Sequence, residues 1–148
     1  MSMSFFAIHD GIGRITQGSK IFAPDARYEQ QLRDLGHSFV IDEKATLRSP
    51  EAWYVDRPDS ADRTLAKRRD LSVIAMRNRI KAGGSDKAVL IGIPRNACVT
   101  ITTGGLVVYE GKPGATELEI AIPVPCIYRI AVDLWPFKTH VTEIEAVA

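Results

Sequence analysis

The sequence predicts an α+β protein in three parts: a small N-terminal α/β module over residues 1–57, a connecting helix over residues 58–86, and a C-terminal Ig-like antiparallel β-sandwich over residues 87–148. Three observations support this order. Two extended segments flank an Asp-Gly turn near the N-terminus, a helical pattern with clear end signals follows, and short apolar segments then alternate with Gly and Pro turns. Regular spacing of strands and turns is typical of a small sandwich or barrel.

The N-terminal module is expected to begin with a hairpin. Its turn is Asp10-Gly11-Ile12-Gly13, since Asp-Gly between extended segments favours a hairpin and the extra Ile-Gly predicts a longer or bulged turn. A helix should then run from Pro24-Asp25 to about Leu35, because Pro and Asp suit a first helical turn and Gly36 suits the end. The strands predicted for this module are Ser4–His9, Arg14–Ser19, Ser38–Asp42 and Trp53–Val55.

The connecting helix is predicted from its two ends and its apolar positions. Ser60 suits an N-cap after Arg57-Pro58, and Gly83-Gly84 would end a helix that begins at Ala61. Apolar residues recur every seven positions over about two heptads, which gives a coiled-coil-like stripe. This stripe either packs on the protein's own domains or associates with copies of the chain. The candidate interface residues on the stripe are Ala66, Val73, Met76 and Ile80.

The C-terminal part consists of apolar segments of strand length, separated by turns such as Thr103-Gly104-Gly105 and Pro123-Val124-Pro125. The predicted strands are Ala88–Ile93, Cys98–Thr102, Leu106–Glu110, Leu118–Ile122, Cys126–Val132 and Val141–Ile144. Cys98 and Cys126 lie within these apolar patterns. They are expected to be buried free thiols, with a disulfide between adjacent strands as the alternative.

Charge and composition narrow the classes of partner. The 19 basic and 18 acidic residues nearly balance, so neither nucleic acid nor an anionic membrane is expected as a partner. A positive excess lies in residues 58–86, where a solvated helix face, phosphate contacts and an acidic protein neighbour are the three interpretations. The first residues lack a signal-peptide pattern, and no apolar run approaches the ~20 residues of a membrane span, which predicts folding in a reducing cytoplasm.

Few residues have the types and spacing that catalysis needs. The three His residues lie outside any nucleophile motif, and no His or Cys has metal-ligand spacing, so no catalytic residue, metal ion or cofactor is predicted. Gly11-Ile12-Gly13 lacks the third glycine and the Lys-Ser/Thr pair of a phosphate loop. The aromatic residues Trp53, Tyr54, Trp135 and Phe137 suggest either a sugar-binding or protein-contact platform or core anchors, and for Trp135 the choice stays open.

Several phrases of the sequence resemble small tail-region structural proteins of tailed bacteriophages and prophages. The resemblance begins with the strands and the Asp-Gly-x-Gly-Arg-Ile turn in Phe5–Gly18, and continues with the aromatic-Tyr-Val-Asp-Arg-Pro phrase at Trp53–Pro58. In the C-terminal part it includes Ile91–Pro94, Val99–Ile101 and the Tyr-x-Ile-x-Val-x-x-Trp-Pro phrase at Tyr128–Pro136. It covers most of the chain except the predicted helix, where many relatives look shorter.

This resemblance implies a structural part of the virion tail, near the baseplate or the tail fibre, assembled in the host bacterial cytoplasm. The implied partners are other virion tail proteins, and a homo-oligomer with the tail's symmetry is expected because tail parts repeat around an axis. A tail-fibre assembly chaperone is one alternative. A receptor- or glycan-binding module that uses Trp53 and Trp135 is another. The family pattern carries no catalytic residues.

Overall fold

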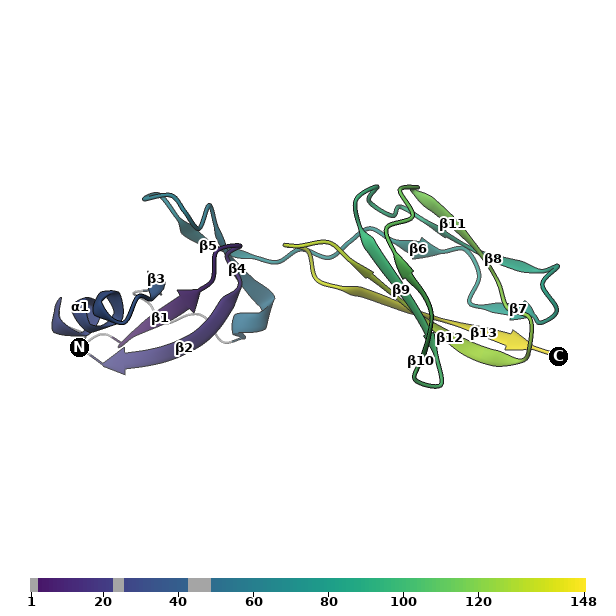
Figure 1. Ribbon diagram of the computed structural model, residues 1–148, viewed down its shortest axis with the longest axis horizontal. Coiled ribbons are helices and arrows are strands. Elements are labelled where there is room, and N and C mark those ends of the chain that lie inside the picture. The colour runs from purple at the N-terminus through teal and green to yellow at the C-terminus, as the bar shows by residue number, and fades with distance from the viewer. Residues whose placement is uncertain (1–2, 23–25, 43–48) are drawn as a thin grey trace. The chain divides into compact units, whose positions relative to one another are not determined.

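The computed structural model describes residues 3–22, 26–42 and 49–148. Strands account for 54% of the structure and helix for 9%, so the protein is mostly β, with several antiparallel sheets and less helix than the predicted α+β fold requires. The chain divides into two compact units, Met1–Arg68 (unit 1) and Arg69–Ala148 (unit 2) (Figure 1). Each unit has its own sheets and its own buried apolar clusters.

Unit 1 contains two antiparallel sheets and a helix. The larger sheet has the order β2-β1-β3, and the smaller one pairs β4 with β5. Its elements are β1 (Met3–His9), β2 (Ile15–Phe22), α1 (Ala26–Asp34), β3 (Ser38–Asp42), the short 3-10 helix η1 (Pro50–Ala52), β4 (Trp53–Asp56) and β5 (Thr64–Lys67). The strands that the sequence predicts for this region are therefore confirmed, with β2 extending further than expected.

The central strand β1 is buried on both faces, because its alternating side chains enter two different clusters. Phe6 and Ile8 pack with Leu32 of α1 and Phe39 of β3, and the ring of Tyr28 meets the Phe6 ring edge-on at 4.8 Å. On the opposite face, Phe5 and Ala7 pack against three partly buried side chains: Ile15, Trp53 and Leu65. A helix thus covers one face of the sheet, and the β4–β5 hairpin covers the other.

Helix α1 ends in the hydrogen-bond pattern that a glycine terminator predicts. Gly36 has a φ of 80°. The N–H of His37 donates to the carbonyl of Leu32 at 3.0 Å, and the N–H of Gly36 donates to that of Arg33 at 2.9 Å, which is a Schellman motif. The start predicted at Pro24-Asp25 lies outside the described residues.

The Asp-Gly turn is confirmed and is held by two sets of hydrogen bonds. The Asp10 carboxylate accepts from the N–H groups of Ile12 and Arg14 at 3.1 and 2.9 Å. The carbonyl of Gly13 accepts from the N–H of Val55 at 2.7 Å, which ties the turn to β4. Gly13 has a φ of 90°, and a Cβ there would lie 2.1 Å from the Val55 carbonyl oxygen, so this close approach requires glycine.

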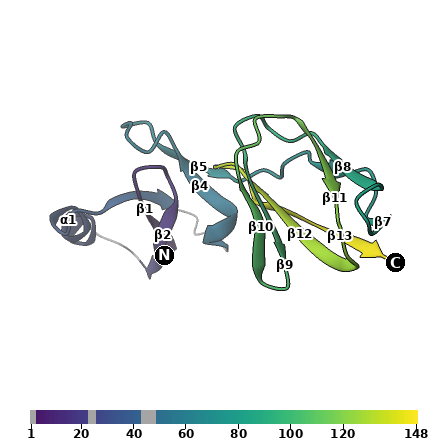
Figure 2. The ribbon, with the colours of Figure 1, turned by 45° about the vertical axis from the view of Figure 1, so that its right-hand side comes forward.

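Unit 2 contains a five-stranded sheet with the order β10-β9-β12-β13-β7, whose strands are labelled in Figure 2. It also contains a three-stranded sheet with the order β11-β8-β6. All pairs are antiparallel except β13 with β7. The strands are β6 (Ile74–Ala75), β7 (Arg79–Lys81), β8 (Lys87–Ile91), β9 (Cys98–Thr103), β10 (Leu106–Gly111), β11 (Glu117–Ala121), β12 (Cys126–Asp133) and β13 (His140–Val147). The strands predicted from residue 88 onward are confirmed, with ends that differ by a few residues.

The two sheets of unit 2 bury side chains in one common cluster. Leu90 of β8 and Ile120 of β11 come from the smaller sheet, while Val99, Ile130 and Ile144 come from the larger one. From Ile127 to Asp133, exposed and buried side chains alternate along β12, as expected for a strand with one covered face, and Ala131 is half-buried rather than exposed. Tyr128 also belongs to this cluster.

The connecting helix predicted over residues 58–86 is wrong. The segment instead contains turns and the strands β5, β6 and β7, and it is divided between the two units after Arg68. Ser60, the expected N-cap, stabilises a turn: its hydroxyl oxygen accepts from the N–H of Asp62 at 3.1 Å, and its carbonyl accepts from the N–H of Arg63 at 3.3 Å.

The helix prediction fails because Val73, one residue of the predicted stripe, also fits a period of two with its neighbours Leu71 and Ala75. Leu71 and Val73 are buried in the unit 2 cluster and Ala75 packs against it, while the intervening Ser72 and Ile74 are exposed. This alternation is that of an extended chain. The large cluster of unit 2 accepts the extended form, and tertiary packing of this kind overrides local helix propensity.

Candidate functional site

Strand β10 exposes an uninterrupted apolar segment at the edge of the five-stranded sheet. The exposed fractions are 72% for Leu106, 58% for Val107, 48% for Val108 and 39% for Tyr109. Its pairing with β9 shifts register between Val107 and Tyr109, which marks a bulge at Val108. An exposed apolar edge strand is a template for pairing with another chain unless its geometry prevents it, and bulges are one such device.

An apolar groove opens between β10 and β11, the free edges of the two sheets of unit 2. Its volume is about 240 Å³. Val108 and Tyr109 line it from β10, and Leu118 and Ile120 line it from β11. Ile101 and Tyr128, which are members of the buried cluster, also line it. The core of unit 2 is therefore reachable from this edge, which we call the β10–β11 edge.

Carboxylates flank the β10–β11 edge. Glu110 on β10 and Glu117 and Glu119 on β11 are all exposed. Glu119 accepts a hydrogen bond from the Lys87 ammonium at 3.2 Å, whereas Glu110 and Glu117 form no ion pair with any residue that the structure describes. The edge therefore combines an apolar floor with an acidic rim.

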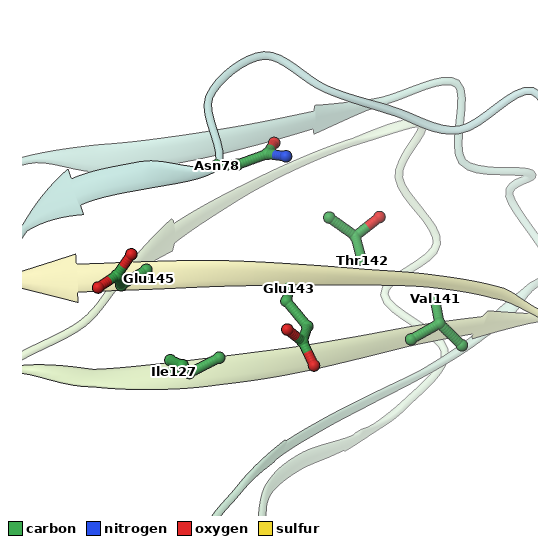
Figure 3. Close-up of a pocket in the computed structure, with 6 residues that line it drawn as sticks. All are labelled: Asn78, Ile127, Val141, Thr142, Glu143 and Glu145. Atoms are coloured by element: carbon green, nitrogen blue, oxygen red, sulfur yellow. The ribbon is translucent and has the colours of Figure 1, made fainter.

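A second, polar groove lies on β13 and its two neighbours (Figure 3). Its volume is about 450 Å³, and its lining consists of Asn78, Ile127, Val141, Thr142, Glu143 and Glu145. The carbonyl of Asn78 accepts from the N–H of Glu145 at 2.8 Å, so backbone pairing fixes one wall. Small-molecule sites are usually apolar and enclosed, whereas most of these side chains are exposed on an outer sheet face.

The turn between β7 and β8 is organised around Asp86. The pKa of its carboxyl is held below the ordinary value of 3.8, first by a hydrogen bond of 2.9 Å from the backbone N–H of Lys81 and then by a hydrogen bond from the Arg77 guanidinium. The positive charge of Arg77 and the backbone N–H of Lys87 act in the same direction. This carboxylate therefore ties the residues before, within and after β7 into one turn.

The four residues of the predicted helical stripe do not form one surface. Ala66 is half-buried in β5 of unit 1, whereas Val73 and Ile80 are buried in the core of unit 2. Met76 is 62% exposed. The apolar surface of Val73 and Ile80 is thus already covered within the chain, and of the four side chains Met76 alone is largely exposed.

The aromatic candidates belong to different units. Trp53 and Tyr54 lie half-buried in β4 of unit 1, where Trp53 packs under β1 and the Lys67 ammonium lies 5.5 Å from its ring centroid. In unit 2, Trp135 is half-buried just beyond β12, and Phe137 packs against the common cluster. Trp53 and Phe137 thus act as core anchors, and a binding role for Trp135 stays a prediction.

The β10–β11 edge was not among the sequence-predicted sites. An apolar run such as Leu106–Tyr109 reads as a buried strand, since sequence pattern alone does not distinguish a covered edge from an open one. The signal that points to it is a run of four apolar residues between Gly104-Gly105 and Gly111, next to strands in which apolar and polar residues alternate.

The two cysteines, Cys98 and Cys126, are free thiols, and both are half-buried rather than fully buried.

Within residues 3–22, 26–42 and 49–148, no three His, Cys, Asp or Glu side chains gather as a metal site requires. In the same part of the chain, no helix is long and apolar enough to span a membrane. No protein-family model matches the sequence, and no curated protein matches it.

Proposed function

We propose that this chain is a non-enzymatic structural protein of a bacteriophage virion tail, in the baseplate or tail-fibre region, that docks other tail proteins. The observation that carries the proposal is the β10–β11 edge, where an exposed apolar strand borders an opening into the core. Contiguous exposed apolar surface of this kind typically marks a protein-interaction site. We assign this docking to a virion tail because segments of the sequence, including Trp53–Pro58 and Tyr128–Pro136, resemble those of tail proteins.

Unit 2 is proposed to be an Ig-like β-sandwich. In chain order, β8, β9, β11, β12 and β13 correspond to strands B, C, E, F and G of that fold, with β6 and β7 sharing the role of strand A and β10 as an added edge strand. The sheet orders β11-β8-β6 and β10-β9-β12-β13-β7 then read E-B-A and C′-C-F-G-A. Such a module suits docking because its sheets form a rigid scaffold for exposed edges.

Several copies of the chain are proposed to act together in the particle. Tail components repeat around the tail axis, so each interface that joins this protein to a neighbour recurs by cyclic symmetry. Met76, which is largely exposed, stays a candidate contact for such a neighbour.

The experiment is a comparison of purified particles with the lysate of the phage or prophage that encodes the chain, by quantitative mass spectrometry. A tail component should be present in purified particles at a fixed copy number per tail. Presence in the lysate and absence from particles would overturn the proposal and favour the assembly chaperone.

A variant of the β10–β11 edge tests whether incorporation into particles depends on this surface. Val107→Lys places a charge on an exposed side chain and should reduce the copies per particle. Val141→Lys is the matched control, since Val141 is also exposed but lies on β13. Equal incorporation of both variants would contradict docking through β10.

A further inference from the structure

We infer that the β10–β11 edge binds an extended segment of a partner protein in which apolar and basic side chains alternate, and that this segment pairs with the outer edge of β11. The inference deepens the proposed function and rests on it for the premise that the edge docks a protein. Addition of a strand to a sheet edge is an established mode of peptide recognition, in which backbone hydrogen bonds give affinity and side-chain pockets give specificity.

Strand β11 is the better template of the two free edges. Its register with β8 runs without a shift from Glu117 to Ala121, so its outer backbone edge is regular. The edge of β10 is interrupted by the bulge at Val108, which twists a strand and disfavours pairing. In this arrangement β11 provides the backbone partner, and β10 provides a side wall of the groove.

The length of the connection before β11 explains why the edge is free. In Ig domains of the constant type, strand D lies beyond strand E at this sheet edge. Here residues 112–116 join β10 directly to β11, and they include Pro113 and Gly114, so no further strand is present between them. The added segment would occupy the position of strand D.

The apolar half of the partner pattern follows from the floor of the groove. Leu118 and Ile120 alternate with exposed residues along β11 and line the groove together with Ile101 and Tyr128. A paired strand turns every second side chain toward this floor. The volume of about 240 Å³ lies below the ~300–1,000 Å³ of typical small-molecule pockets, so a few apolar side chains fit it better than a drug-sized ligand.

The acidic rim favours basic side chains in the partner segment. The same rim disfavours a second copy of this chain as the partner. Glu117 and Glu110 have no ion-pair partner among the described residues, and Lys112 in the connection pairs with neither of them. Side chains that an added strand turns away from the floor lie beside Glu117, which alternates with Leu118 and so faces the outer side of β11, and this position favours Lys or Arg. Two copies joined at this edge would bring like charges together, which is unfavourable.

The test measures binding of the full chain to fluorescent peptides by anisotropy at low and moderate salt. A peptide that alternates Val and Lys should bind, and its affinity should fall as salt rises, because rim charges are screened. A peptide that alternates Val and Glu should bind more weakly. Two further Val-Lys peptides carry N-methyl groups on one or the other set of alternate residues. Methylation of the set that faces β11 should abolish binding, whereas methylation of the other set should not.

Charge-reversal variants locate the site. Glu117→Lys should weaken binding of the Val-Lys peptide by roughly two- to fivefold, the range of an exposed ion pair, and should strengthen binding of the Val-Glu peptide. Glu143→Lys makes the same charge change on an exposed residue of β13 and should leave both affinities unchanged. Both substitutions are on exposed side chains, and circular dichroism checks that each variant is folded.

Four results would overturn the inference: no binding of any of these peptides, equal binding of the Val-Lys and Val-Glu peptides, equal binding of both N-methylated peptides, or concentration-dependent dimerisation that Glu117→Lys changes. The last result would assign the edge to a second copy. Each is distinct from failure of the proposed function, because presence of the protein in particles is measured separately. A tail protein that binds none of these peptides would keep the proposed function and refute the added strand.

Discussion

Unit 1 and unit 2 close their hydrophobic cores in different ways. In unit 1 the central strand β1 is covered on both faces, by α1 on one side and by the β4–β5 hairpin on the other. In unit 2 two sheets share one cluster, and that cluster is open along the β10–β11 edge, where buried Ile101 and Tyr128 line a groove.

The exposure of apolar residues has a different basis in each unit. The exposed Phe22 of unit 1 lies at the end of β2, whereas Leu106–Tyr109 of unit 2 form a continuous segment beside an opening into the core. Single exposed apolar residues are normal on protein surfaces, but contiguous ones indicate an interaction surface. Substitutions in the core, in the backbone, at a charged turn and at the open edge should therefore affect the two units differently.

The largest effect is expected for Phe6→Ala in unit 1. Phe6 is fully buried and contacts the rings of Tyr28 and Phe39, so its truncation should lower the free energy of unfolding by about 3–5 kcal/mol. Amide hydrogen exchange in β1, β2 and β3 measures this loss. The control is Phe22→Ala in the same sheet, where the side chain is 55% exposed and the change should stay within about 0.5 kcal/mol. Equal losses would contradict the closed core of unit 1.

The next largest effect concerns the backbone of unit 2 at Gly92. It has a φ of 78°, and an added Cβ would lie 2.3 Å from the Ser72 carbonyl oxygen. Gly114 has a φ of 70° but no atom within 4 Å of such a Cβ. Gly114→Ala should therefore cost about 1–2 kcal/mol from the left-handed conformation alone, and Gly92→Ala should cost more because the backbone must move. Chemical denaturation of both variants tests the ranking, which a larger loss for Gly114→Ala would refute.

A smaller, pH-dependent effect is expected at Asp86. Because the folded state holds the pKa of this carboxyl below 3.8, the carboxylate stabilises the fold above that pH, and the contribution is lost as the pH falls through the folded-state pKa. Asp86→Asn should therefore be less stable than the natural chain at pH 7, and the difference should shrink at acid pH. Thermal unfolding across this range measures it, and a difference that grows on acidification would contradict the assignment.

The smallest effect on stability is expected at the open edge itself. Val107 is 58% exposed, so Val107→Lys should change the free energy of unfolding by no more than about 0.5 kcal/mol. Its effect should appear in docking instead, as fewer copies per particle. A large loss of stability would show that β10 serves the core of unit 2 rather than a partner, and the contrast between the units would disappear.

Much of the fold could be predicted from the sequence, because local signals set it. The turn at Asp10–Gly13 follows from an Asp side chain and a glycine that allows close approach to Val55. The end of α1 follows from Gly36, and the strands after residue 88 follow from alternation between Gly and Pro turns. The candidate site could not be predicted, since whether Leu106–Tyr109 is covered depends on which strands lie beside it.

Local sequence is enough to predict where the strands after residue 88 begin and end and where α1 ends, because turns and caps depend on neighbours a few residues away. The conformation of residues 58–86 depends instead on tertiary structure, because Val73 fits both the predicted helical stripe and an extended chain in which Leu71, Val73 and Ala75 face the same side. The cluster of unit 2 selected the extended form, since burial against distant strands outweighs the small differences in local propensity. Tertiary structure likewise decided that β10 and β11 end their sheets with an open groove between them, because sheet order joins residues far apart in the chain.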